Sequence, residues 1–132
     1  RVNLLAPLFL IRALAGRAPA GRVVNLLDRR IAGLEPGALA YQLSKRGLAD
    51  LTRLAALELA PGFTVNAVAP GPVRPPAEGD GRIPDRAGTT PLNRRPTPDD
   101  VAQAVLFLLA AESVTGQILF VDGGQHLAGR RA

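Results

Sequence analysis

The sequence predicts an α/β fold in which helices cover both faces of a parallel sheet. Along the 132 residues, three short apolar runs alternate with three longer stretches that have the periodicity of helices. Each apolar run is bounded by glycine or proline, as buried strands commonly are. Strands that alternate with helices in this way are joined by right-handed crossovers into a parallel sheet. We expect residues 1–132 to form one domain of this kind.

The first half of the chain is expected to contain a helix, a strand, a loop and a second helix. Residues 3–16 (NLLAPLFLIRALAG) have apolar side chains on nearly every face and end at a glycine, which is typical of a mostly buried helix. Residues 21–27 (GRVVNLL) contain paired valines and predict a buried strand. Residues 28–38 contain two glycines and a proline and predict a loop, and helical periodicity then returns over residues 39–60 until Pro-Gly stops it.

The second half repeats the alternation after one long irregular segment. Residues 63–69 (FTVNAVA) predict the second strand. Residues 72–96 are rich in proline, glycine and charge and are too long for a plain connection, so we expect a substrate lid there. The segment TPDD begins a helix that runs to residue 111, because Thr97 can cap it and the two aspartates face its positive end. Residues 117–124 (QILFVDGG) predict the last strand and a glycine turn.

Composition limits the classes of function. With 47% hydrophobic and 20% charged residues the chain is typical of a globular protein, and no apolar run approaches the roughly 18 residues of a membrane-spanning helix. The formal charge of +5 comes from scattered arginines with few aromatic residues, so we expect no nucleic-acid partner. There is no cysteine, and the only histidine, His126, is expected to face solvent, so we expect no metal site. No secretory leader is recognisable, and we expect a cytoplasmic protein.

The segment YQLSK contains the only tyrosine and the only lysine of the chain, Tyr41 and Lys45. A spacing of four residues places both side chains on one face of the predicted helix, about one turn apart. A free phenol has a pKa of about 10, and a nearby ammonium favours the phenolate and lowers that pKa. A tyrosine adjusted in this way can act as a general acid or base on an alcohol or carbonyl oxygen.

YQLSK resembles the Tyr-x-x-x-Lys signature of the short-chain dehydrogenase/reductase family. Its surroundings strengthen the resemblance: GRVVNLL is similar to the strand before the family's catalytic serine, KRGLADLTRLAALELAPGFTVNAVAPGPV to its long helix, next strand and Pro-Gly turn, and TGQILFVDGG to its final strand. The resemblance implies the C-terminal half of a Rossmann-type, doubly wound parallel sheet. The family's glycine-rich dinucleotide loop has no counterpart in these residues, so we expect an N-terminal part to precede Arg1.

The resemblance also implies roles for individual residues. Tyr41 would be the acid/base and would contact both substrate and cofactor, while Lys45 would bind the nicotinamide ribose hydroxyls and lower the pKa of Tyr41. Asn3, in RVNLLAP, would hold a water or backbone contact in the proton path, although an asparagine there could equally cap the first helix. The residues implied to lie against the nicotinamide and its carboxamide are Pro70, Gly71 and Val73. The implied cofactor is NADP(H), and NAD(H) stays open because the residues that read the ribose phosphate lie upstream.

Asp28 departs from the family pattern. Thirteen residues before its tyrosine the family usually has serine, whereas aspartate there resembles the pteridine reductase and dihydromonapterin reductase branch. In that branch the carboxylate helps to deliver a proton to a ring nitrogen and orients the pterin. Reduction of a C=N bond needs a proton at nitrogen, and a carboxyl hydrogen-bonded to Tyr41 could relay one. We therefore expect Asp28 to be catalytic and to bind a pterin-like substrate, although aspartate also commonly bonds to the loop that follows it.

Two other interpretations remain open. The chain could belong to a general carbonyl or 3-oxoacyl reductase in which the serine has drifted to aspartate. It could instead be a truncated, non-catalytic product that only folds, binds or oligomerises.

The resemblance further implies a homodimer or homotetramer that packs through the helix of Tyr41. That helix carries a stripe of apolar and small residues, with Gly47 and Ala55 as the small residues expected at a partner subunit. The other members of the stripe are Leu43, Leu48, Leu51, Leu54 and Leu59.

Overall fold

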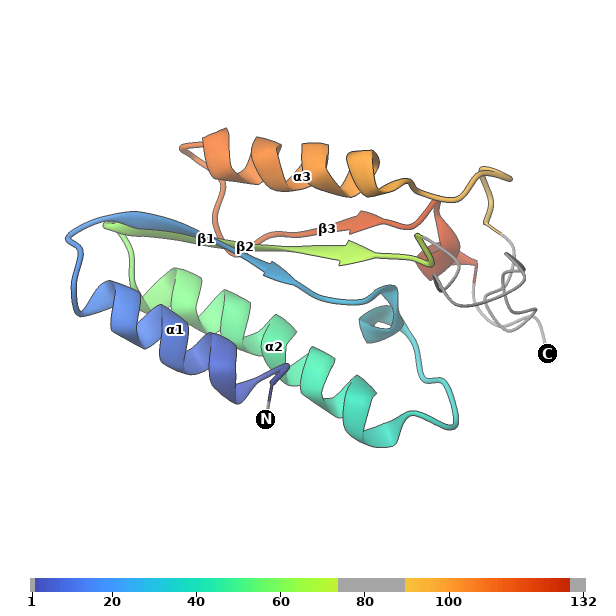
Figure 1. Ribbon diagram of the computed structural model, residues 1–132, viewed down its shortest axis with the longest axis horizontal. Coiled ribbons are helices and arrows are strands. Elements are labelled where there is room, and N and C mark those ends of the chain that lie inside the picture. Colours follow the sequence, from blue (N-terminus) through green and yellow to red (C-terminus); the bar gives the residue numbers. More distant parts are fainter. Residues whose placement is uncertain (1, 74–89, 129–132) are drawn as a thin grey trace.

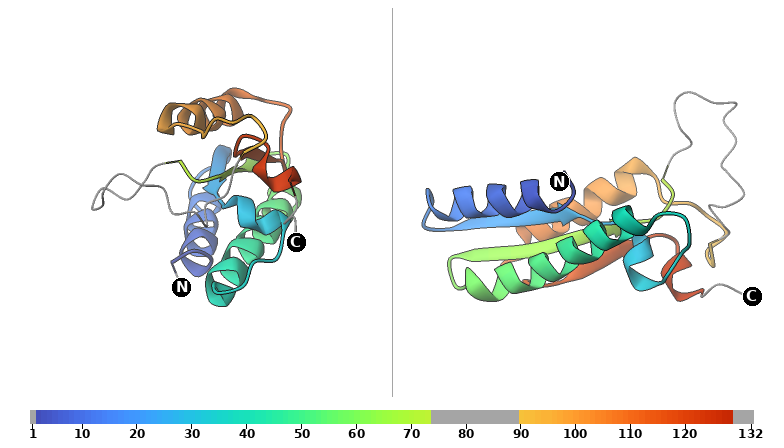
Figure 2. Two further views of the ribbon diagram at one scale, coloured as in Figure 1. Left: turned by 90° about the vertical axis from the view of Figure 1, so that its right-hand side faces the viewer. Right: turned by 90° about the horizontal axis from the view of Figure 1, so that it is seen from below.

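The computed structural model describes residues 2–73 and 90–128 and shows three layers (Figure 1). A parallel sheet of three strands in the order β1-β2-β3 forms the middle layer. Helices α1 and α2 cover one face of the sheet and α3 covers the other, as the views in Figure 2 also show. The predicted fold class and the predicted order of elements are confirmed. The strands are β1 (Gly21–Leu26), β2 (Phe63–Pro70) and β3 (Ile118–Val121), and the helices are α1 (Leu5–Ala15), α2 (Leu39–Glu58) and α3 (Pro98–Ala110).

The central strand β2 carries most of the core. Val65, Ala67, Val68 and Ala69 are all fully buried, because β2 has a strand on each side and helices above and below. Successive side chains of a strand point to opposite faces. Accordingly, Val65, Ala67 and Ala69 pack in the clusters on the side of α1 and α2, whereas Val68 packs with Ala104 and Leu108. A strand buried on both faces reads as a nearly continuous apolar run, and β2 does.

Strand β1 is held in register by close packing at its first residue and by a polar bridge to α2. Gly21 pairs with Phe63, and a Cβ at Gly21 would lie 2.5 Å from the ring of that phenylalanine, so only glycine fits. Further along, the buried side chain of Asn25 donates a hydrogen bond of 2.9 Å to Thr52 of α2. Thr52 in turn donates to the Leu48 carbonyl at 2.8 Å. These contacts fix α2 against β1.

The buried face of α2 differs from the predicted stripe. The residues of α2 that face the core are Gln42, Leu48, Ala49, Thr52, Ala55 and Ala56. The small residues Gly47 and Ala55 were expected at a partner subunit, but both are covered within this chain. A Cβ at Gly47 would lie 3.0 Å from the side chain of Leu4, and Ala55 packs beside Ile11 of α1. The leucines left outside are Leu39, Leu43, Leu54 and Leu57. Of the predicted stripe, Leu48, Leu51, Ala55 and Leu59 pack in the core, whereas Leu43 and Leu54 are exposed, because a spacing of four residues drifts around a helix that turns every 3.6 residues.

Helix α3 begins as the sequence predicts. Thr97 is its N-cap and accepts a hydrogen bond from the Asp100 backbone, while the Asp100 carboxylate accepts from the Thr97 backbone at 2.7 Å, which completes a capping box. The predicted lid falls mostly on residues 74–89, which lie outside the described residues. Within the described ranges, no helix is both long and apolar enough to span a bilayer.

Candidate active site

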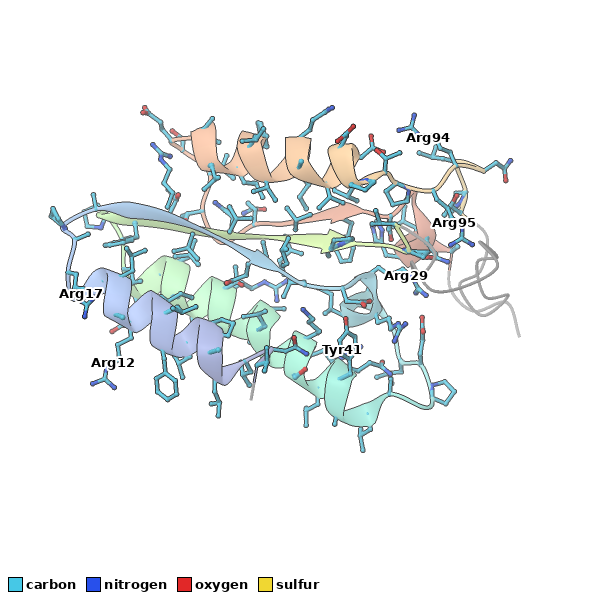
Figure 3. The ribbon with its side chains drawn as sticks, in the orientation of Figure 1. Arg12, Arg17, Arg29, Tyr41, Arg94 and Arg95 are labelled. Carbon is cyan, nitrogen blue, oxygen red and sulfur yellow. The ribbon has the colours of Figure 1, made fainter. Side chains whose placement is uncertain are left out.

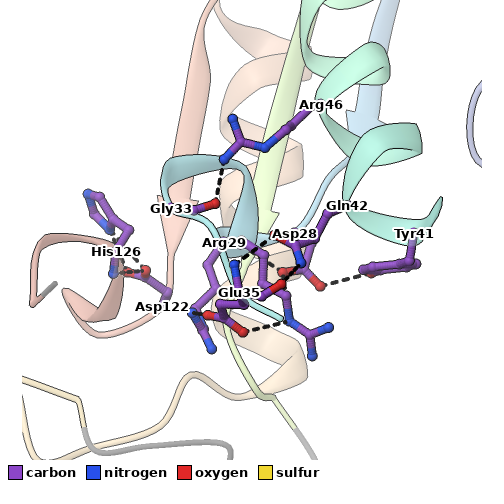
Figure 4. Close-up of polar contacts among 10 residues, drawn as sticks. Asp28, Arg29, Gly33, Glu35, Tyr41, Gln42, Arg46, Asp122 and His126 are labelled. Atoms are coloured by element: carbon purple, nitrogen blue, oxygen red, sulfur yellow. Dashed lines mark hydrogen bonds and ion pairs between the residues drawn. The ribbon is translucent and has the colours of Figure 1, made fainter. Parts of the chain in front are cut away.

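The candidate site lies where β1 ends and α2 begins (Figure 3). Asp28 follows β1, and Tyr41 is in the first turn of α2. The Tyr41 hydroxyl donates a hydrogen bond of 2.8 Å to Oδ2 of Asp28, and the other carboxylate oxygen accepts from the Arg30 backbone N–H at 2.8 Å (Figure 4). Asp28 therefore caps the short helix η1 (Arg29–Ala32) and also holds the phenol. Both sequence interpretations of Asp28 describe bonds that this side chain makes at once.

Lys45 lies one turn after Tyr41 on the same face of α2. Its Nζ donates a hydrogen bond of 2.8 Å to the carbonyl of Leu26, the last residue of β1, and lies 5.9 Å from the centre of the Tyr41 ring. Burial lowers the pKa of Lys45, and the charge of Asp28 opposes that change. The structure thus brings together Asp28, Tyr41 and Lys45, as the sequence predicts.

The expected direction of the Tyr41 pKa is wrong for this structure. Burial, the hydrogen bond to Asp28 and the negative charge of Asp28 raise the pKa of Tyr41 to about 12, while the charge of Arg30 lowers it. A carboxylate that accepts the phenolic proton stabilises the protonated form. The expectation considered only Lys45, whose ammonium is directed at the Leu26 carbonyl, and left out Asp28. The Tyr41 hydroxyl is consequently protonated at neutral pH and donates its hydrogen bond to Asp28.

Sequence reasoning missed a polar network that surrounds the phenol. The guanidinium of Arg30 lies 5.6 Å from the centre of the Tyr41 ring, and its Nε lies 3.5 Å from Glu35. Glu35 also pairs with Arg29 at 2.6 Å. The buried side chain of Gln42 donates to the backbone carbonyl of Glu35 and accepts from its N–H (Figure 4). The only sequence signal was a pair of arginines directly after Asp28, which by itself indicates nothing beyond a charged loop.

Asn3 is not the cap of α1. That position belongs to Leu4, whose side chain makes no capping bond, so the alternative interpretation of Asn3 is wrong. Asn3 instead lines a cavity of about 510 Å³ between α1 and β1, together with Lys45 and Leu26. Neither Tyr41 nor Asp28 lines this cavity. Asn3 and Lys45 therefore share a space that lies beside the phenol rather than around it.

Pro70 is the last residue of β2, the strand next to β1 in the sheet, and Gly71 and Val73 follow it. All three are half-buried. The Gly71 backbone N–H donates to the Val121 carbonyl at 2.9 Å. A Cβ at Gly71 would lie 2.8 Å from the Cβ of Asp122, so a larger residue would push the turn away from β3. These residues and Asp28 lie at the same edge of the sheet, because parallel strands end together.

His126 lies in the short helix that follows β3 (Gln125–Leu127). The sequence predicted that it faces solvent, whereas it is half-buried. Its Nδ1 lies 2.9 Å from a carboxylate oxygen of the buried Asp122, and its ring stacks on Phe120 with centres 4.0 Å apart. The turn before it contains Gly123 and Gly124 with φ of 64° and 85°, which confirms the predicted glycine turn. Among the described residues, no three acidic or histidine side chains gather as a metal site would require.

Comparisons with known proteins agree on one family. The family model described as enoyl-(acyl carrier protein) reductase matches residues 1–126. Protein FixR of Bradyrhizobium diazoefficiens is 42% identical over 137 residues, covering 96% of this chain and 48% of that protein. The 3-oxoacyl-[acyl-carrier-protein] reductase FabG of Thermotoga maritima is 40% identical over 114 residues, covering 79% of this chain and 45% of that protein.

Among solved structures, FolM alternative dihydrofolate reductase 1 from Brucella canis, complexed with NADP, is similar with a TM-score of 0.84 and 36% identity. The match covers 96% of this chain and 52% of that one. The chain thus spans about half the length of the relatives it matches.

Proposed function

The chain belongs to the short-chain dehydrogenase/reductase family, and on that premise we propose that it contributes the catalytic residues of an NADPH-dependent reductase that acts on a pteridine-like C=N bond. The observation that carries the proposal is the 2.8 Å hydrogen bond from the Tyr41 hydroxyl to Asp28. Members of the family usually have a serine at this position, whereas a carboxyl group can also exchange a proton with the phenol. The similarity to the FolM structure supports the same substrate class.

The residues present fit the nicotinamide-ribose end of such a cofactor. An ammonium has three N–H donors, and Lys45 uses one on the Leu26 carbonyl, which leaves donors for ribose hydroxyls. Asn3 lines the same cavity as Lys45 and can hold a water or backbone contact beside it. Pro70, Gly71 and Val73, at the end of the neighbouring strand, would lie against the nicotinamide ring and its carboxamide.

The proposed chemistry divides between a hydride and a proton. When bound, the reduced nicotinamide supplies the hydride that adds to the carbon of the C=N bond. Tyr41 supplies the proton that the ring nitrogen takes up, because its hydroxyl is protonated at neutral pH and is held beside the substrate site. Asp28 holds the hydroxyl in place, and a proton that its carboxylate takes up from water can pass to the phenolate across the 2.8 Å contact, which restores the pair for the next turnover.

The second candidate is a carbonyl or 3-oxoacyl reductase. The relative that supports it is FabG of Thermotoga maritima, at 40% identity. On that proposal Asp28 would take the place of the usual serine and hold the phenol without giving a proton to a ring nitrogen. The third candidate, a non-catalytic chain, differs from both because it predicts no binding of NADPH.

A homodimer or homotetramer through α2 stays part of the proposal, on different residues from those first expected. Leu43, Leu54 and Leu57 are 67%, 66% and 79% exposed along the outer side of α2. Exposed leucines on one helix are commonly covered by a partner in an assembly. We also propose the cytoplasm as the location.

The proposal is tested with two substrate classes in the protein that carries this chain. We expect NADPH oxidation to depend on a dihydropterin. Its kcat/KM should be at least tenfold higher than with a 3-oxoacyl thioester or a simple ketone. Tyr41→Phe should abolish it, because the variant keeps the ring and loses the proton. Faster reduction of ketones than of dihydropterins would move the assignment to the carbonyl reductases, and failure to bind NADPH in a fluorescence titration would leave the non-catalytic chain.

A further inference from the structure

We propose that Arg30, a residue that no family pattern assigns, is a positioning residue of this site whose guanidinium, held over the ring of Tyr41, offsets the negative charge of Asp28 at the phenol. The proposal rests on the proposed function only for its biological meaning. The contact itself and its electrostatic effect are properties of the chain and can be measured without substrate.

The geometry places Arg30 beside both groups that exchange the proton. Its Cζ lies 5.6 Å from the centre of the Tyr41 ring, within the roughly 6 Å at which a guanidinium interacts with an aromatic face. Its Nε lies 3.8 Å from Oδ1 of Asp28. The side chain is 37% exposed, so part of its charge is screened by water and part acts on the phenol.

The position of Arg30 is fixed by contacts that run back to the helix of Tyr41. Glu35 pairs with Nε of Arg30 at 3.5 Å and with Arg29 at 2.6 Å. The backbone N–H and carbonyl of Glu35 are both bound by the side chain of Gln42, the residue next to Tyr41 and only 7% exposed. The arginine is therefore tied, through one carboxylate and one amide, to the turn of α2 that carries the phenol.

The charged groups around Tyr41 act in different directions. Asp28, at the end of β1, raises the pKa of Tyr41 as an acceptor and as a negative charge, and Arg30 of η1 lowers it. Arg29 of η1 is paired with Glu35 of the same loop. On α2, Lys45 is directed at the Leu26 carbonyl.

The order in which these cations lose their protons separates Arg30 from Lys45. Burial lowers the pKa of Lys45 from its ordinary value of 10.5, whereas the pKa of Tyr41 is about 12. Lys45 is thus largely neutral by the time the phenol ionises, while an arginine stays charged above pH 12. Arg30 is the cation beside the ring that can still stabilise the phenolate as it forms.

The test uses the single tyrosine of a chain without tryptophan, so the alkaline absorbance change of the phenolate reports Tyr41 alone. The Asp28→Asn background brings the ionisation to a pH where the fold can be checked by circular dichroism. In that background, Arg30→Gln should lower the ionisation constant of Tyr41 about threefold or more, the value for a unit charge at 5.6 Å in a water-like dielectric. Arg30→Lys should restore little of the loss, because a lysine is largely neutral at the pH where the phenol ionises.

Arg29→Gln is the matched control, since it is the adjacent arginine, shares the Glu35 partner and should leave the ionisation constant unchanged. An unchanged constant in Arg30→Gln, or an equal change in Arg29→Gln, would overturn the proposal, and so would a larger change in Lys45→Gln than in Arg30→Gln.

Where a variant unfolds in alkali, the single tyrosine labelled at its ζ carbon is read by NMR at neutral pH. Its signal should move in Arg30→Gln and stay in Arg29→Gln, and the reverse would refute the contact. If these results hold but the wild-type protein does not reduce a dihydropterin, only the proposed function is contradicted.

Discussion

Replacing Asp28 by asparagine should make the Tyr41 hydroxyl ionise at lower pH. The pKa of Tyr41 is raised to about 12 by burial, by the hydrogen bond to Asp28 and by the charge of Asp28. Asparagine keeps the shape of the side chain and removes the charge. A hydrogen bond to a charged group contributes about 1.5–3 kcal/mol, and we take the lower end because Tyr41 is 37% exposed. About 1.5 kcal/mol corresponds to a roughly tenfold larger ionisation constant.

The assay is an alkaline absorbance titration of the chain, in which Tyr41 is the only tyrosine. Circular dichroism at each pH shows whether the fold persists. Asp50→Asn is a suitable control, because Asp50 lies on the same helix and forms an exposed ion pair with Arg53, away from the phenol. A midpoint that is the same in Asp28→Asn and in wild type would show that the 2.8 Å contact does not govern the phenol, and the proton-delivery argument would then have no basis.

Three further predictions concern stability. With a pKa of about 12 the folded chain holds the Tyr41 proton where the unfolded chain has lost it, so stability should fall as pH rises above about 10. In urea unfolding the fall should exceed that of Tyr41→Phe by about 1 kcal/mol, the full shift being discounted for exposure. Asn66→Ala should cost about 3 kcal/mol in the same assay, because Asn66 bonds the backbone of the segment before β3 through both side-chain atoms. Thr64→Val is its control and should be neutral or stabilising, since the Thr64 hydroxyl is buried without a partner in the described part of the chain. Gly71→Ala should lower the melting temperature and weaken NADPH binding in a fluorescence titration, because its Cβ would lie 2.8 Å from Asp122, and an unchanged affinity would detach this turn from the cofactor.

The elements of the fold could be predicted because their signals are local. Apolar runs bounded by glycine and proline indicated β1, β2 and β3, and Thr97 with the acidic residues after it indicated the start of α3. The face of α2 that packs inward was predicted less well. Leu43 and Leu54 were expected in one stripe with Ala55, yet the first two are exposed and the third is buried. Which leucines are covered depends on where β1, β2 and α1 lie, and periodicity does not contain that information.

The site shows the same division. Tyr41, Lys45 and Asp28 could be found from spacing along the chain, and the structure brings them together. The direction of the Tyr41 pKa shift could not be predicted from the sequence, because it depends on which oxygen accepts the phenolic proton and on how the loop after β1 folds back. Arg30 could not be identified from the sequence for the same reason. Its place over the ring is set by the carboxylate of Glu35, whose backbone is bound by Gln42.

The ratio of kcat/KM for a dihydropterin to kcat/KM for a 3-oxoacyl thioester, in wild type and in Asp28→Ser, tests the central claim most directly. Serine is the residue that the family usually has there, so it can hold the phenol but has no carboxyl group to exchange a proton. We predict that Asp28→Ser binds NADPH as wild type does and loses about a hundredfold in kcat/KM for the dihydropterin, the scale of one positioned acid or base. An unchanged ratio in Asp28→Ser would contradict the assignment of Asp28 to proton delivery and, with it, the pteridine substrate.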